Sequence, residues 1–153
     1  MIHIGLEILK KLQFKDHGQV GLIINPPETY HPVMNGISGG VDLEPKLNTY
    51  EFIQVFGTNN DTLQTDALKV IDYLVDDGLL WLSYPKKSSS RYKGSDCSRD
   101  TVMYLLKDQG FEPVRQIAID DDWSALRFRQ VKNIKQMKRS FAVTEEGQNK
   151  VNQ

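Results

Sequence analysis

Three short and nearly continuous apolar runs stand out along the chain. They cover residues 20–25, 51–56 and 79–84. Runs of this length without polar alternation are typical of parallel strands that are covered on both faces. Pro26-Pro27 predicts the end of the first strand, because proline has no N–H group to donate to a neighbouring strand. Residues 28–49 show little periodicity, and we expect at most one short strand there, near residues 41–43.

Apolar residues at helical spacing flank these runs. One face of a first helix is formed by Ile4, Ile8, Leu9 and Leu12. A second helix is expected to begin at Asp61 and Gln64, which are spaced like a capping box, and to continue until Asp77-Gly78. A third is expected to begin near Asp96 and Ser98 and to end at Gly110.

Two further strands are expected at residues 114–119 and 124–128. Their link is short and acidic, Asp-Asp-Asp-Trp at residues 120–123, which predicts an antiparallel hairpin. Strands that alternate with helices elsewhere predict a mostly parallel sheet with helices on both faces. The sequence therefore predicts one Rossmann-like α/β domain over residues 1–130, with a C-terminal antiparallel hairpin. A basic and then polar tail, residues 131–153, is expected to be partly disordered.

The composition is ordinary for a globular protein. Of the 153 residues 39% are hydrophobic and 25% are charged, and the formal net charge is −1. The single cysteine, Cys97, excludes an internal disulfide and favours a reducing, cytoplasmic setting. No apolar run approaches the roughly 20 residues that a membrane-spanning helix needs. The near-neutral charge argues against bulk electrostatic binding to nucleic acid but leaves local basic patches open.

The candidate chemistry gathers in the loop after the third apolar run. Residues 85–93 read PKKSSSRYK and contain four basic residues and no acidic one. A buried strand that leads into such a loop before a helix N-terminus is a common anion site in α/β proteins. The candidate ligand-binding residues are Tyr84, Lys86, Lys87, Ser88, Ser89, Arg91 and Ser98, together with Asn25 and Pro26 after the first strand. A solvated surface loop without a ligand is the open alternative.

The chain resembles two known groups of proteins over most of residues 5–130, and most strongly from Gly78 to Arg129. Its order of strand, loop, helix, Gly110-Phe111 and closing hairpin resembles the C-terminal half of class I S-adenosylmethionine methyltransferases. The strings YPKKS at residues 84–88 and WSALR at residues 123–127 resemble a bacterial family of small proteins of unknown function. The first resemblance implies a methyltransferase-like fold with a reduced N-terminal half, and S-adenosylmethionine as a cofactor. The second implies a fold but no reaction.

The turn after the first strand departs from the methyltransferase pattern. Those enzymes carry a glycine-rich turn there, whereas this chain has Asn-Pro-Pro-Glu at residues 25–28. Asp42 and Glu44 are the candidates for the acidic residue that holds the ribose. The same turn resembles the [Asp/Asn]-Pro-Pro-aromatic motif of amino-group methyltransferases, with Glu28 in place of the aromatic residue. A turn that simply ends the strand is the simpler interpretation of these residues.

Other side chains give weaker signals. Cys97 lies at a predicted helix N-terminus beside Arg99, a setting that lowers the pKa of a thiol. It has no histidine near it in sequence, so a bystander thiol is the simpler interpretation. No metal site is predicted, because His3, His17 and His31 lack ligand spacing. We expect core or anchoring positions for Trp81 and Trp123.

These observations favour a Rossmann-like module that binds a small anionic or nucleotide-like ligand, or a partner protein, with no catalytic residue assigned. One alternative is an S-adenosylmethionine-dependent methyltransferase with a degenerate cofactor loop. The other is a nucleic-acid accessory protein that uses residues 86–93 and a basic face of the tail. That face would be formed by Lys132, Lys135, Lys138 and Arg139.

Overall fold

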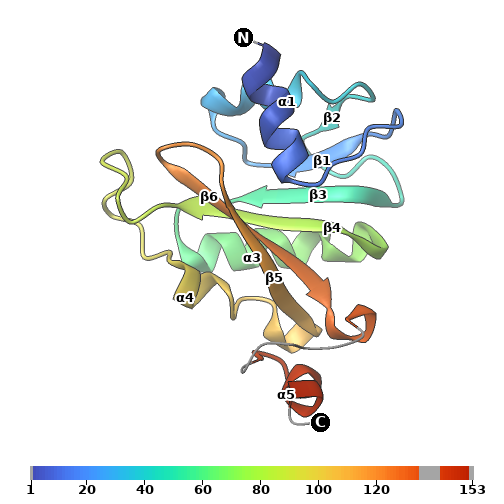
Figure 1. Cartoon of the computed structure of the whole chain (residues 1–153), viewed down its shortest axis with the longest axis vertical. Coiled ribbons are helices and arrows are strands. Elements are labelled where there is room, and N and C mark those ends of the chain that lie inside the picture. The colour runs from blue at the N-terminus through green and yellow to red at the C-terminus, as the bar shows by residue number, and fades with distance from the viewer. Residues whose placement is uncertain (1, 135–141, 152–153) are drawn as a thin grey trace.

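The computed structural model describes residues 2–134 and 142–151. It contains a six-stranded sheet in the order β2-β1-β3-β4-β6-β5 (Figure 1). The parallel strands are β1 (Gly21–Ile24), β2 (Val41–Asp42), β3 (Tyr50–Phe56) and β4 (Leu74–Pro85). The last two strands, β5 (Phe111–Ala118) and β6 (Trp123–Gln130), form a hairpin that pairs antiparallel with β4. The predicted mostly parallel sheet with a C-terminal antiparallel hairpin is confirmed.

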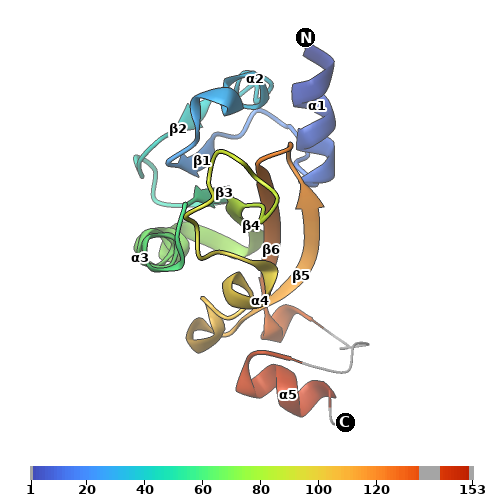
Figure 2. The ribbon, with the colours of Figure 1, turned by 90° about the vertical axis from the view of Figure 1, so that its left-hand side faces the viewer.

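Helices lie on both faces of the sheet but do not cover all of it. One face carries α1 (Ile2–Lys11) and α2 (His31–Met34), and the other carries α3 (Asn60–Val70) and α4 (Arg99–Val102) (Figures 1 and 2). Short helical turns and a last helix complete the fold: η1 (Glu28–Tyr30), η2 (Ile71–Tyr73), η3 (Lys107–Gln109), η4 (Val131–Asn133) and α5 (Glu145–Val151). On the α1 side, neither view shows a helix over β6 and β5.

Each face of the sheet has its own buried core. Leu63 and Ala67 of α3 pack with Leu80 and Leu126 on one side. On the other side Leu12, Ile23, Phe52 and Trp81 pack together, and the Trp81 indole N–H donates to the carbonyl oxygen of Leu12 at 3.1 Å. The core positions predicted for the two tryptophans are confirmed, since Trp81 is 0% exposed and Trp123 is 4% exposed.

The helix after β3 has different ends from those that its apolar spacing predicts. Asn59, rather than Asp61, caps it, because the Asn59 side-chain oxygen accepts a hydrogen bond from the Thr62 backbone N–H at 2.9 Å. The helix ends at Val70, and Leu74, predicted to lie on its apolar face, begins β4 and pairs with Tyr50. Strand pairing therefore overrides helical spacing at this position.

Asp77-Gly78 marks a bulge inside β4 instead of a helix end. Tyr50 pairs with Leu74, and Phe52 next pairs with Leu79, so β4 accommodates five residues where β3 advances by two. Asp77 has a left-handed φ of 56°, as a local distortion of a strand requires. The bulge carries Asp76 and Asp77 to the surface of the sheet's amino end.

The third predicted helix is much shorter than expected. It does begin after Ser98, whose backbone N–H donates to the Thr101 hydroxyl at 2.9 Å, but α4 consists of only four residues. The chain then continues in irregular turns and η3 until Gly110, whose φ of 82° requires no Cβ. Val102 and Leu106 are nevertheless fully buried. Both residues therefore belong to the core, although no continuous helix joins them.

Part of the predicted tail is ordered against β5. Glu112 of β5 is 0% exposed, and its carboxylate accepts hydrogen bonds from the backbone N–H groups of Val143 (3.0 Å) and Thr144 (2.6 Å), just before α5. The boundary at residue 130 stays a prediction. Of the basic tail residues Lys132 is exposed, whereas Lys135, Lys138 and Arg139 lie outside the described residues.

Candidate functional site

A pocket of about 490 Å³ opens at the carboxyl end of β4. Its lining comes from three parts of the chain that lie far apart in sequence. They are Tyr84, Pro85, Lys86, Lys87 and Ser88 from β4 and its loop, Ser98, Arg99 and Asp100 from the start of α4, and Gln116 and Ser124 from the hairpin. The structure thus brings most of the predicted anion-binding residues to one place.

Tyr84 is the most informative residue of this pocket. Its side chain is 2% exposed, and its hydroxyl has no hydrogen-bond partner among the residues that the structure describes. Burial raises the pKa of Tyr84 to about 12, against the smaller opposing effect of the Arg99 charge. A buried polar group without a partner costs about 1–3 kcal/mol, so this hydroxyl is poised to donate to a ligand atom.

The pocket has an excess of positive charge. Lys86, Lys87 and Arg99 contribute three positive charges and Asp100 one negative charge, which leaves 3 − 1 = 2 in favour of an anion. The hairpin turn holds the start of the loop in place, because the Lys86 backbone N–H donates to the carbonyl oxygen of Asp122 at 2.8 Å. The lysine side chains therefore start from a fixed backbone, which lowers the entropic cost of binding.

Two residues of the loop that were predicted to bind a ligand do not line the pocket. Ser89 is 3% exposed, and its hydroxyl donates to the Asp122 carboxylate at 2.7 Å, so it anchors the loop on the hairpin turn. Arg91 is exposed and outside the pocket lining. Tyr92, the aromatic residue of this loop, packs edge-on against Trp123 with ring centroids 5.0 Å apart.

The turn after β1 forms a separate environment. Asn25 has a left-handed φ of 57°, and its side-chain amide donates to the Asp66 carboxylate of α3 at 2.8 Å. Pro26 and Pro27 follow and offer no N–H groups, and the next buried residue is Tyr30, whose hydroxyl donates to Gln54 Oε1 at 2.7 Å. Asn25 and Pro26 are therefore not part of the β4 pocket.

This environment lies where an α/β sheet usually binds its ligand. The strand order reverses between β1 and β3, and ligands gather at the carboxyl ends of strands at such a point. Here Phe56 fills the edge, packing edge-on against Tyr30 at 4.7 Å and against Trp123 at 5.2 Å between ring centroids. At the start of α3, the Asn60 backbone N–H donates to the Asp96 carboxylate at 2.8 Å. The Asp96 carboxylate thus occupies the Asn60 N–H group, which an anionic ligand at the start of α3 would need.

The residues at the β1 turn do not fit S-adenosylmethionine. A nucleotide-binding turn uses glycines so that its backbone can approach the ligand, and free N–H groups to hold it. Residues 25–28 contain no glycine, and two of the four, Pro26 and Pro27, have no N–H group. Asp42, a candidate for holding the ribose, accepts a hydrogen bond from the Tyr50 hydroxyl at 2.6 Å, and Glu44 is simply exposed.

Cys97 is not an activated thiol. It is 2% exposed, and burial raises its pKa, so the lowering expected from a helix N-terminus is wrong. The physical reason is that α4 is a single turn with little dipole, while desolvation penalises the thiolate. In residues 2–134 and 142–151 no cluster of three His, Cys, Asp or Glu is suited to a metal ion. Within the same residues no helix is long and apolar enough to span a membrane.

Four residues that line the pocket were not predicted from the sequence to bind a ligand: Arg99, Asp100, Gln116 and Ser124. The two hairpin residues join the pocket because β6 pairs with β4 and β5 pairs with β6. No spacing in the sequence connects them to Tyr84. Gln116 does break the apolar pattern of its strand, beside the buried Ile117, and that is the one local signal available.

No family model matches the sequence, and no curated protein is similar to it. Solved structures do resemble the fold. A SAM-dependent methyltransferase from Aquifex aeolicus has a TM-score of 0.59 and 13% identity over 83% of this chain and 89% of that chain. The fibrillarin/Nop5p complex has a TM-score of 0.55 and 11% identity over 81% and 78%. The N-methyltransferase NodS from Bradyrhizobium japonicum has a TM-score of 0.51 and 13% identity over 84% and 88%.

These likenesses show a shared fold and not a shared activity, because the identities are so low. The methyltransferase-like Rossmann fold predicted from the order of elements after Gly78 is confirmed. The resemblance of YPKKS and WSALR to a family of small proteins of unknown function stays a prediction.

Proposed function

We propose that this protein is a binding module on a methyltransferase-like fold, and that it holds a small anionic ligand in the pocket at the end of β4. The observation that carries the proposal is the Tyr84 hydroxyl. The hydroxyl is buried and has no partner among the described residues, and Tyr84 lines a pocket with a surplus of positive charge. A ligand oxygen would satisfy the hydroxyl and the charge together.

Each pocket residue has a distinct role in this proposal. Tyr84 donates a hydrogen bond to a phosphate or carboxylate oxygen, and Lys86 and Lys87 supply charge-assisted bonds to the same group. Ser88 adds a hydroxyl at the rim. Asp100 repels a second anionic group and accepts from an amine or hydroxyl, so the preferred ligand carries one anionic end and one donor end.

The size of the pocket supports a small molecule larger than inorganic phosphate. About 490 Å³ lies within the range of roughly 300–1,000 Å³ that is typical of small-molecule sites. A mononucleotide or a phosphorylated metabolite has this size and this combination of groups. S-adenosylmethionine is disfavoured, because the β1 turn has no glycine, two of its residues are prolines without an N–H group, and its surroundings are filled by Tyr30 and Phe56.

Isothermal titration and thermal unfolding with phosphate, mononucleotides and S-adenosylmethionine test the proposal. A ligand at about a hundredfold excess over its dissociation constant stabilises the protein by roughly 2.7 kcal/mol. We expect an anionic ligand to raise the melting temperature and S-adenosylmethionine to leave it unchanged. A shift with S-adenosylmethionine and none with any anion would overturn the proposal in favour of a methyltransferase.

Three variants locate the site. Tyr84→Phe removes only the hydroxyl, and we expect affinity to fall about tenfold, since one hydrogen bond to a charged group is worth roughly 1.5 kcal/mol or more. The double variant Lys86→Ala with Lys87→Ala should lose more. Lys93→Ala is the matched control, because Lys93 lies in the same loop, is exposed and does not line the pocket. Equal losses in the control and the double variant would show that the loop acts by charge alone.

A further inference from the structure

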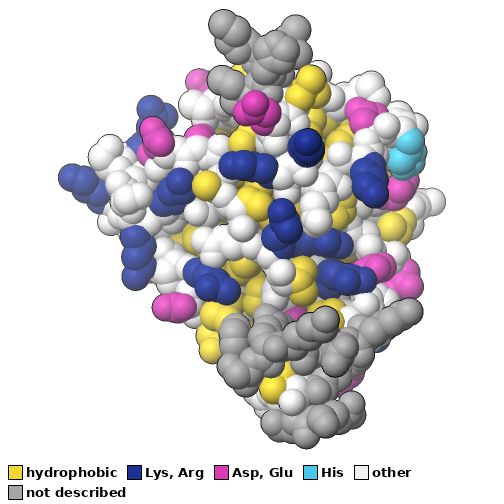
Figure 3. Space-filling view, in the orientation of Figure 1, with side chains coloured by type: hydrophobic (Ala, Val, Ile, Leu, Met, Phe, Trp, Pro, Cys, Tyr) yellow, Lys and Arg dark blue, Asp and Glu magenta, His cyan; other side chains and the backbone are white. Residues whose placement is uncertain are grey.

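The uncovered half of the sheet carries arginine residues where a covered face would carry apolar ones. Arg115 of β5 lies directly opposite Arg127 of β6, and Arg129 follows two residues later on the same strand. At the far end of β5, the Lys11 ammonium donates to the carbonyl oxygen of Ala118 at 3.1 Å. Figure 3 shows Lys and Arg side chains gathered over this part of the molecule. We call these four residues the basic face.

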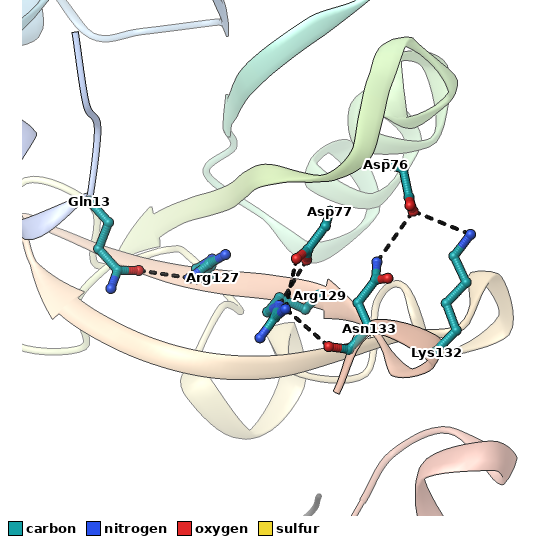
Figure 4. Close-up of polar contacts among 7 residues, drawn as sticks. All are labelled: Gln13, Asp76, Asp77, Arg127, Arg129, Lys132 and Asn133. Atoms are coloured by element: carbon teal, nitrogen blue, oxygen red, sulfur yellow. Dashed lines mark hydrogen bonds and ion pairs between the residues drawn. The ribbon is translucent and has the colours of Figure 1, made fainter. Parts of the chain in front are cut away.

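The basic face is incompletely neutralised by the protein itself. Arg129 is paired with the Asp77 carboxylate of the β4 bulge, with N–O distances of 2.9 and 2.8 Å (Figure 4). Arg127 instead donates to the neutral Gln13 Oε1 at 2.8 Å, and its Nε is buried without a partner among the described residues. Arg115 is exposed and has no acidic partner in residues 2–134 and 142–151.

This arrangement is unfavourable for the isolated protein. Like charges directly opposite each other in an antiparallel pair are destabilising. Burial lowers the pKa of Arg127, and the neighbouring Arg129 and Arg115 lower it further, against the opposing effect of Asp77. A polyanionic partner would relieve the repulsion between these guanidinium groups.

The chemistry of the face points to phosphodiesters. Guanidinium groups match phosphate oxygens with paired hydrogen bonds, which ammonium groups do not. Residues two apart on a strand lie about 7 Å from each other, while a duplex carries one charge per roughly 1.7 Å of its axis. Several phosphates of a duplex therefore fall within reach of Arg115, Arg127 and Arg129 at once.

A duplex fits the face better than a single strand. Proteins that bind single strands stack the bases on exposed aromatic rings. Among the described aromatic residues on this side of the sheet, Phe14 is 8% exposed, Phe52 and Trp81 0% and Trp123 4%, and the Tyr92 ring is partly buried against Trp123. We propose that the basic face binds the phosphodiester backbone of double-stranded nucleic acid, independently of sequence. This surface lies apart from the β4 pocket, so the proposal does not rest on the proposed function.

Fluorescence anisotropy with a labelled DNA duplex of about 20 base pairs, and an RNA duplex of the same sequence, tests this inference. Affinity should fall as salt rises from about 50 to about 200 mM, with a slope near −0.9 per phosphate contacted. Arg115→Gln should weaken binding several-fold and reduce the slope by about 0.9. Binding of either duplex supports the proposal, and the ratio of the two affinities identifies the preferred helix form.

The control is Lys69→Gln, which removes one exposed positive charge from α3 on the opposite face. It should leave duplex affinity within about twofold of the parent chain, as should the double variant Lys86→Ala with Lys87→Ala. Arg127→Gln tests the second arginine, with circular dichroism to establish that the variant is folded. Absence of duplex binding at low salt, or equal losses in Lys69→Gln and Arg115→Gln, would overturn the inference. So would tighter binding of a single strand, or of polyglutamate, than of the duplex.

Discussion

The carboxyl edge of the sheet has a closed half and an open half. At β1 and β3, Tyr30 and Phe56 fill the edge, and the Asp96 carboxylate accepts a hydrogen bond from the backbone at the start of α3. At β4, a pocket of about 490 Å³ remains. Tyr30 and Tyr84 are both 2% exposed, yet the Tyr30 hydroxyl donates to Gln54 and the Tyr84 hydroxyl donates to no described residue.

The comparison separates fold from function. The closed half lies at the reversal of strand order, where a methyltransferase-like fold is expected to bind its cofactor, and here that place is part of the core. The open half lies at β4, the strand next to β3, and keeps a donor without a partner among the described residues. A likeness in fold therefore does not carry the ligand with it, and the unsatisfied groups are the better guide.

The largest loss of stability should come from removing a buried ring in the closed half. Phe56→Ala removes a ring that is 1% exposed and packed between Tyr30 and Trp123, and we expect it to lower the free energy of unfolding by about 3–5 kcal/mol. Urea denaturation measures this. Tyr92→Ala, at the partly exposed end of the same aromatic row, should cost less than half as much. A loss of under about 1 kcal/mol for Phe56→Ala would mean that this half is not a packed core.

A matched pair of tyrosine variants tests the contrast directly. Tyr30→Phe leaves Gln54 Oε1 without its donor in a buried site, and we expect a loss of about 1–3 kcal/mol. Tyr84→Phe removes a hydroxyl that has no partner among the described residues, so stability should be unchanged or slightly higher. Equal losses in the two variants, measured by thermal unfolding without ligand, would show that Tyr84 is already satisfied.

The hydrogen bond between the start of α3 and the Asp96 carboxylate should contribute less to stability. Asp96→Ala removes the acceptor of the Asn60 N–H and a negative charge near a helix N-terminus, together worth about 1 kcal/mol. Asp61→Ala is the control, because Asp61 lies in the first turn of the same helix and is exposed. Asp61→Ala should lose only the favourable interaction of a negative charge with the helix N-terminus. The difference in unfolding free energy between the two variants therefore reports the hydrogen bond. Indistinguishable losses would argue against that bond.

A pH dependence at alkaline pH tests the burial of Tyr84. The folded pKa of Tyr84 is raised by burial from 10.0 to about 12, so the neutral form is favoured in the folded state. Its contribution to stability is complete below about pH 10 and is lost as the pH rises toward 12. The stability difference between the parent chain and Tyr84→Phe should therefore change only in this interval. Urea denaturation at several alkaline pH values measures it, and a constant difference would contradict the burial of Tyr84.

Local patterns were sufficient for much of the fold. The apolar runs at residues 20–25, 51–56 and 79–84 became β1, β3 and the main part of β4, because strands covered on both faces need continuous apolar sequence. The acidic link became the hairpin turn, in which the Asp120 carboxylate accepts from the backbone N–H groups of Asp122 and Trp123 at 2.8 Å.

The sequence by itself therefore determined the order of strands and helices, the hairpin and the loop that carries the lysines of the site. Tertiary structure decided where the second helix ends, which hydroxyl of the loop faces the pocket, and that Gln116 and Ser124 complete it. It also decided that Arg115 lies opposite Arg127. The physical reason is that periodicity and turn chemistry act between near neighbours in the chain. Strand pairing instead joins residues that are far apart in sequence, and burial then determines which of their polar groups have partners.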